Sequence, residues 1–352
     1  MKLFLLFGLF FFYKKSLSQP PDTFLIKRLV NHAIVLYPDK ADSILYYAYY
    51  IRQESLKLNY PYGETYSYRL MGSYHRFNDN FDSARVYFQQ FLDKAKFHKL
   101  AFAEWLAIID IADVNMNVGE YEHALTLYLK AVSITPQLDG NFKNYSHVYN
   151  GLADAYQYLK KYDSAVRYFK EAIRYDILAG DSVRLAERKS NVSEVLMLKG
   201  ELNEAEQYLN ESLAYNSRNN IIDALWYNYC NLGKLHLLKN NLSLSEKYFR
   251  LAYKQSEKTT SPFKVSDALD GLSEVYRIQG NFKKAMEYKL LADSADWIAD
   301  KEKIAKDFSR LQERHKTSKK EQENYRLLYF LEKEVQKKRN LTTAIIVLNI
   351  LL

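Results

Sequence analysis

The chain has 352 residues, enough for one large or two ordinary domains with a sizeable core. Its 11 Gly and 6 Pro are about half and about a third of average usage, which favours long helices joined by short turns over an α/β enzyme. The 31 Tyr and 19 Phe argue against disorder, and the single Cys excludes disulfide frameworks and Cys-based zinc or iron–sulfur sites. The net charge of +8 lies at the two ends, whereas residues 21–300 carry 34 basic and 35 acidic side chains. We therefore expect no nucleic-acid binding by this chain.

The first segment, residues 1–18, has the pattern of a secretory signal peptide. Lys2 precedes an apolar run at residues 3–12 that is too short to span a bilayer, and Ser16 and Ser18 suit a cleavage before Gln19. The sequence therefore predicts export of the rest of the chain. An uncleaved anchor and a buried core helix are the alternatives.

A repeat of about 40 residues occupies residues 65–300 in six copies, and residues 24–60 look like a degenerate earlier copy. Each copy has one small residue before its central turn and one after it. These structural repeat positions are Gly72, Ala112, Ala153, Gly233 before the turn, and Ala84, Ala124, Ala165, Ala205, Ser245, Ala285 after it. In the other two copies Ser193 and Ser273 stand at the position before the turn. Small residues let two helices approach closely, and a large residue one turn later fills the space between them. Each hairpin then leaves an apolar face open, so the copies must stack.

These positions resemble the tetratricopeptide repeat. The copy from Ser146 fits best, with Leu152, Ala153, Tyr156, Ala165, Phe169 and Ala172, and Pro136 closes the preceding copy. The resemblance implies an all-α fold, a right-handed superhelical solenoid of helical hairpins. The family unit is about 34 residues long, so about six extra residues per copy predict longer helices or turns.

In this family the first helix of each unit lines a concave groove that binds peptides. Carried over by register, the candidate peptide-binding residues are Tyr66, Arg69, Arg76, Asp113, His147, Asn150, Asp154, Tyr158, Glu187, Tyr227, Lys234, Glu274 and Arg277. This mixed polar and aromatic set suits peptide segments, although any one of these residues could simply be a solvated surface residue.

Residues 301–340 contain no Gly or Pro and are rich in Lys, Glu, Gln and Arg. Apolar side chains there follow a 4,3 spacing in part, which predicts a coiled-coil linker helix with a polar seam and a homodimer through it. A merely exposed helix is the alternative.

The final residues, 341–352, are uncharged and follow three basic residues, Lys337, Lys338 and Arg339. Twelve residues are too few to cross a bilayer, so we interpret them as the truncated start of a transmembrane helix that attaches the chain to the membrane. An apolar tail packed on a partner is the alternative. The basic residues conflict with an exported preceding region under the positive-inside bias.

The complete layout resembles the extracytoplasmic sensor part of bacterial tetratricopeptide sensor histidine kinases and transcriptional regulators. That resemblance implies a membrane-attached, non-catalytic receiver of a two-component-type signal, with the repeats in the periplasm. No output module is present in the 352 residues, so kinase activity is not carried over. A stand-alone or cytoplasmic adaptor that mediates protein–protein interactions is the alternative reading.

Catalytic motifs are missing from the sequence. The seven His form no HExxH, and neither GxGxxG nor GxxxxGK[ST] occurs. We therefore expect no enzyme, no cofactor and no metal. An enzyme with an unrecognised site would require a deep pocket with convergent ionisable groups.

Overall fold

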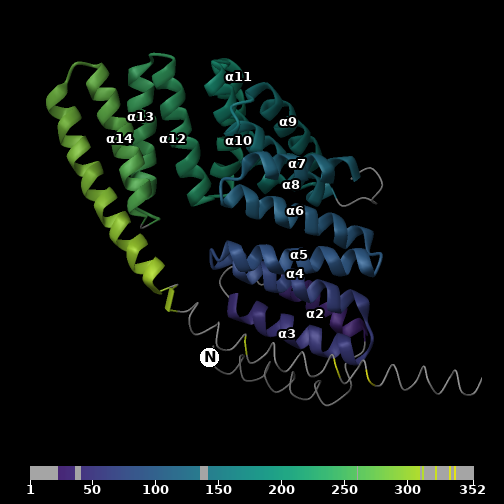
Figure 1. The fold of residues 1–352 in the computed structure, drawn as a ribbon. Helices are drawn as coiled ribbons and strands as arrows, with labels where there is room; N and C mark the ends of the chain where they lie inside the picture. The colour runs from purple at the N-terminus through teal and green to yellow at the C-terminus, as the bar shows by residue number, and fades with distance from the viewer. Residues whose placement is uncertain are drawn as a thin grey trace, which may run out of the picture. The chain divides into compact units, whose positions relative to one another are not determined.

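The computed structural model describes residues 23–35, 41–134, 142–259, 261–309 and 311–312, and the single residues 322, 333 and 337. Every regular element in these ranges is an α-helix (Figure 1). The helices are α2 (Thr23–Val35), α3 (Ala41–Lys57), α4 (Pro61–Phe77), α5 (Phe81–Phe97), α6 (Ala101–Asn117), α7 (Tyr121–Ile134), α8 (Phe142–Tyr158), α9 (Tyr162–Ala179), α10 (Ser182–Lys199), α11 (Leu202–Arg218), α12 (Ile222–Leu238), α13 (Leu242–Ser256) and α14 (Pro262–Ile278), followed by a final helix over residues 282–309.

The 40-residue period follows from equal helix lengths. α4, α5, α6, α8, α11, α12 and α14 each have 17 residues, and turns of three residues separate α4, α5 and α6. A helix with its turn therefore repeats every 20 residues, and two of them make one hairpin. The six extra residues per copy thus lie mainly in longer helices. We call the first helix of each hairpin the A helix (α2, α4, α6, α8, α10, α12, α14) and the second the B helix.

The turns after the six A helices from α4 to α14 each have one residue in the left-handed region. The residue is Asp79, Gly119, Lys160, Gly200, Asn240 or Gly280, with φ between 52° and 83°. The next N–H donates to the carbonyl five residues earlier, as from Asn80 to His75 and from Asn241 to His236. This Schellman-type closure satisfies the carbonyls at the helix end. An Asn side chain then accepts from the backbone of the following helix at Asn80, Asn241 and Asn281, so the same three residues end one helix and cap the next.

Large side chains of the B helices pack directly on glycines of the A helices. A Cβ added to Gly72 would lie 2.6 Å from the Phe88 ring, and one added to Gly151 would lie 2.5 Å from the Tyr128 ring. Phe249 lies between Gly233 of its own hairpin and Gly271 of the next, where an added Cβ would come within 2.9 and 2.3 Å. All ten structural repeat positions identified in the sequence are buried. The large residue therefore holds together its own hairpin and the hairpin that follows.

The chain divides into two compact units, one containing the helices up to Val118 and one comprising Gly119–Gln312. In the first unit α2 contacts α4 and α4 contacts α6; in the second α10 contacts α12 and α12 contacts α14. B helices of neighbouring hairpins make no comparable contacts within the described ranges. Because the A helices approach one another more closely, they form the inner side of each unit, which is the surface that helical repeats use for binding.

The expectations for the two ends of the sequence concern mostly residues outside the described ranges. The signal peptide at 1–18 and the membrane segment at 341–352 lie wholly outside them. Of the coiled-coil segment 301–340, residues 301–309 are helical and exposed. No helix within the described part of the chain is long and apolar enough to cross a membrane.

Adding a methyl group at Gly271 tests the packing of Phe249. We expect G271A to lower the free energy of unfolding by about 1–3 kcal/mol, because overpacking outweighs the gain of about 1 kcal/mol in helix propensity. The F249L substitution makes room, so G271A should destabilise an F249L background less than the wild type. Denaturant unfolding of the four proteins measures this coupling, and strictly additive effects would contradict the contact.

Candidate functional site on the A helices

Within each unit, polar bonds between successive A helices recur between residues 41 positions apart, and we call this series the polar ladder. Arg69 of α4 bonds to Asp110 of α6, Asn191 of α10 to Asn150 of α8, and Asn231 of α12 to Ser190 of α10. In repeat register, the earlier residue lies three positions before the small residue of its A helix and the later one lies two positions before. The ladder therefore fixes the register between neighbouring hairpins on the inner side of each unit.

In the first unit the ladder is ionic. Nε and Nη2 of Arg69 donate to Oδ2 and Oδ1 of Asp110 at 2.6 and 3.2 Å, and the Asp110 side chain is only 6% exposed. About two helical turns after Arg69 on α4, and one turn after Asp110 on α6, Nη1 of Arg76 donates to Oδ2 of Asp113 at 2.8 Å. Bidentate geometry of this kind makes the arginine–carboxylate pair directional as well as strong. The predicted residues Arg69, Arg76 and Asp113 thus come together at the α4–α6 contact.

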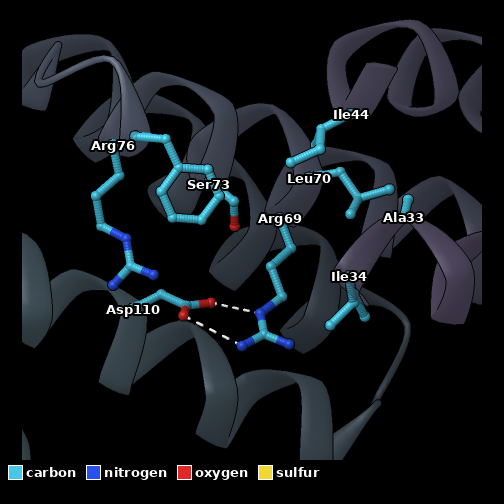
Figure 2. A pocket seen from close by; sticks show the side chains of 9 residues that line it. Ala33, Ile34, Ile44, Arg69, Leu70, Ser73, Arg76 and Asp110 are labelled. Carbon is cyan, nitrogen blue, oxygen red and sulfur yellow. Dashed lines mark hydrogen bonds and ion pairs between the residues drawn. The ribbon is translucent and has the colours of Figure 1, made fainter. Parts of the chain in front are cut away.

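A small pocket opens beside these ion pairs. It has a volume of about 80 Å³ and is lined by Ala33, Ile34, Ile44, Arg69, Leu70, Ser73, Arg76, Phe77 and Asp110. Figure 2 shows the two arginines and Asp110 on one side, and the aliphatic side chains of α2 and α3 on the other. One water needs roughly 10–15 Å³ of such space, so the pocket accepts a group larger than water, such as the end of one side chain.

In the second unit the A-helix face carries a carboxyl group with an unusual environment. Asn150 Nδ2 donates to Asp154 Oδ2 at 2.7 Å. Burial raises the pKa of Asp154 to about 7, although the positive charge of Arg188 and the neighbouring His147 oppose this rise. The nearby Glu187 carboxylate raises the pKa further. Asp154 therefore takes up a proton near neutral pH, and the predicted residues His147 and Asn150 of α8 and Glu187 of α10 form one cluster with it.

The neighbouring helices continue this polar face. Asn231 Nδ2 of α12 donates to Glu194 Oε1 of α10 at 2.8 Å. Arg188 is buried and its Nη1 donates to Glu187 Oε1 at 3.0 Å, while its Nε lies 3.9 Å from the buried Asp176 carboxylate. The charges on this face are thus largely matched within the unit itself.

The other predicted site residues fall into three environments. Tyr66 is a core residue, 6% exposed, with its ring stacked on Tyr62 at 4.3 Å. Tyr158 and Tyr227 are exposed and each lies against a second aromatic ring, Tyr121 at 4.5 Å and Trp226 at 4.7 Å. Lys234 Nζ lies 3.4 Å from Asp267, and Arg277 forms a bidentate pair with Glu274 on the same helix. These last residues stand apart from the Asp154 cluster.

The sequence reasoning missed Asp110, Ser73 and the aliphatic wall from α2 and α3. Asp110 left a signal, because it is an isolated acid in the otherwise apolar stretch 105–112, one period and one residue after Arg69. The aliphatic wall from α2 and α3 gave no such signal in the sequence, since these helices form the degenerate first hairpin. Within the described ranges no group of His, Cys, Asp or Glu side chains is arranged to hold a metal ion.

Tandem helical hairpins with small residues at the helix contacts define a helical repeat protein, and the sequence identifies the kind of repeat. Residues 105–176 match the family described as tetratricopeptide repeat. The match covers 72 of the 352 residues, so this part of the chain is similar to tetratricopeptide repeats. No curated protein sequence matches the chain.

Solved structures share this fold at low sequence identity. BtubC (BKLC) from P. vanneervenii has a TM-score of 0.55 and 19% identity, over 62% of this chain and 92% of that one. Aspartyl phosphate phosphatase F from Bacillus subtilis has a TM-score of 0.57 and 14% identity, over 81% and 91%. The apo form of RapI has a TM-score of 0.53 and 14% identity, over 73% and 99%. These likenesses establish the helical repeat fold.

The loss of stability on breaking an arginine–carboxylate pair should depend strongly on how deeply that pair is buried. R69A should lower the free energy of unfolding by about 3–5 kcal/mol, because it leaves the Asp110 carboxylate buried without its partner. The double substitution R69M with D110L should restore much of that loss. R277A is the matched control, since the Arg277 and Glu274 side chains are 60% and 40% exposed, and should change stability by about 0–1 kcal/mol. Equal effects of R69A and R277A would contradict this account.

The raised pKa of Asp154 predicts that the free energy of unfolding depends on pH. Its folded pKa is raised, so the stability contributed by its proton is complete near pH 4 and is lost as pH rises through about 7. D154N has no carboxyl group to ionise, so its free energy of unfolding should not fall in this way. The difference in free energy of unfolding between D154N and the wild type should therefore increase by a few kcal/mol from pH 4 to pH 8, at about 1.4 kcal/mol per unit of pKa shift. Denaturant unfolding at several pH values measures the difference. The exposed D300N is the control, and parallel pH profiles for D154N and wild type would contradict the prediction.

Proposed function

We propose that this protein is a non-catalytic scaffold that binds a peptide or protein segment on its A helices. The observation that carries the proposal is the pocket of the first unit, where an aliphatic wall faces two arginine side chains. Helical repeat arrays bind extended segments along the inner side of their curvature, and this pocket lies on that side.

The lining indicates what the segment contains. Ala33, Ile34 and Ile44 favour an aliphatic side chain, because covering apolar surface is the main favourable term in such contacts. Arg76 at the opposite wall favours a carboxylate or a backbone carbonyl beside that side chain. The pocket holds one side chain rather than a whole small molecule, so the remaining affinity must come from contacts along the rest of the A-helix face.

We further propose that the array is the signal-receiving part of a membrane-attached receptor of the two-component type. The support comes from the sequence: an apolar start typical of export, a charged segment after the repeats whose pattern predicts a helix, and an apolar segment after that. A stand-alone adaptor is the second candidate, supported by the repeat fold alone, since such modules generally serve protein interactions.

Blocking the pocket tests peptide binding. The full chain is used to select binders from a library of random 12-residue peptides, and the selected peptides are titrated onto variants. S73W should weaken binding at least tenfold, because the indole fills the pocket. V86W, which places the same side chain at an exposed site on α5, should leave binding unchanged. Selected peptides that bind S73W as tightly as wild type would contradict the pocket as the binding site.

The receptor proposal predicts a particular product in the native cells. An antibody to residues 60–300 should detect, in membranes washed with carbonate, a band clearly heavier than the 41.5 kDa of this chain. A soluble product of 41.5 kDa or slightly less would instead support the stand-alone adaptor.

A further inference from the structure

The final helix, residues 282–309, has two different apolar faces. Its first face carries the small residues Ala285, Ala292 and Ala295, which are buried. Ala292 belongs to a cluster with Phe249 and Leu272, and Tyr288 beside it stacks on Tyr276 at 5.4 Å. This face therefore completes the core of the last hairpin, and the helix runs along α14 at the end of the second unit (Figure 1).

The opposite face carries large apolar side chains that are exposed. We call it the Trp297 stripe, and it consists of Met286, Leu290, Trp297, Ile304 and Phe308, each between 57% and 68% exposed. The end of a repeat array is ordinarily polar, because no further hairpin covers it. An uncovered apolar face of this length on a terminal helix marks an interaction surface.

The stripe is symmetric about Trp297. Leu290 and Ile304 lie seven residues before and after it, and Met286 and Phe308 lie eleven residues before and after it. Two opposite charges are also placed symmetrically about Trp297. Asp293 lies four residues before it and Lys301 four residues after it. Members of the stripe and these two charges fall within about 40° of one line along the helix, at 3.6 residues per turn.

We propose that the Trp297 stripe pairs with the same stripe of a second copy, antiparallel, about a two-fold axis at Trp297. A two-fold interface must be complementary to itself, and the symmetric spacing meets that requirement. Leu290 of each copy then lies beside Ile304 of the other, Met286 beside Phe308, and Asp293 faces Lys301. A parallel pair would instead place Asp293 against Asp293 and Lys301 against Lys301.

The residue spacing of the Trp297 stripe and its exposed area both fit a second copy of the chain. Intervals of 4, 3, 4, 4, 3 and 4 residues run from Met286 to Phe308 through Asp293 and Lys301, which is an eleven-residue period of nearly straight helices. With each residue 57–68% exposed, the five stripe residues offer on the order of 600 Å² per copy, near the lower end for specific interfaces. A specific interface buries roughly 800 Å² per partner. This proposal is independent of ligand binding on the A helices.

Cysteine cross-linking of the full chain tests the orientation. Cys230 is buried, and a C230A background removes it. Under mild oxidation W297C should form a disulfide-linked dimer with itself, and L290C mixed with I304C should form a mixed dimer. L290C alone should not cross-link, because the two copies of residue 290 would lie about 21 Å apart along the axis. Cross-linking of L290C alone as fast as the mixture would overturn the antiparallel arrangement.

Sedimentation of the full chain tests the association itself. Wild type should sediment at twice the mass of one chain, and W297D should weaken association at least tenfold. V86D adds a charge at an exposed valine of α5 and is the matched control, which should remain dimeric. D293K and K301D should each weaken the dimer, and combining them should restore it. A monomeric wild type, association unaffected by W297D, or no rescue by the double charge reversal would overturn the proposal.

Discussion

The structure depends on one packing contact, in which a ring of a B helix lies on a glycine of an A helix. Phe249 makes this contact twice, with Gly233 of its own hairpin and with Gly271 of the next. Because close-packed interiors are not continuously deformable, this contact sets the separation of the helices and the angle between successive hairpins. The close approach of neighbouring A helices follows, and with it the polar ladder that they share.

The A-helix face therefore both joins neighbouring hairpins and offers polar groups to a ligand. Its charged and amide groups join neighbouring hairpins, as Arg69 joins α4 to α6 and Asn231 joins α12 to α10. The same groups are the ones available to a ligand. Since most of their charges are already matched, the face attracts partners through a few sites, such as the edge of the ion pairs at the pocket, rather than through a strong overall field.

The repeat register, the buried small residues and the all-helical class follow from the sequence because each is determined within a single hairpin. Contacts between hairpins do not, which explains why Gly151, Gly271 and Asp110 were overlooked. Tyr66 differs from its sequence-based assignment: family register places it in the groove, whereas its ring is buried, stacked on Tyr62 and packed against Phe91. The pocket wall required a hairpin too degenerate in sequence to be used for register. The symmetry of the Trp297 stripe is present in the sequence, but its exposure is not.

The nearly equal length of the helix-and-turn segments, 20 residues from α3 to α7 and from α8 onward, constrains how such a chain can grow. Insertion or loss of a whole hairpin keeps each A helix beside another A helix, so gene duplication can lengthen or shorten the array while preserving its inner side. Loss of a single 20-residue segment would keep the helical period but exchange the inner and outer helices of every later hairpin. Recombination within these genes should therefore retain junctions one full period apart, and the number of hairpins, rather than their length, is the quantity free to vary during evolution.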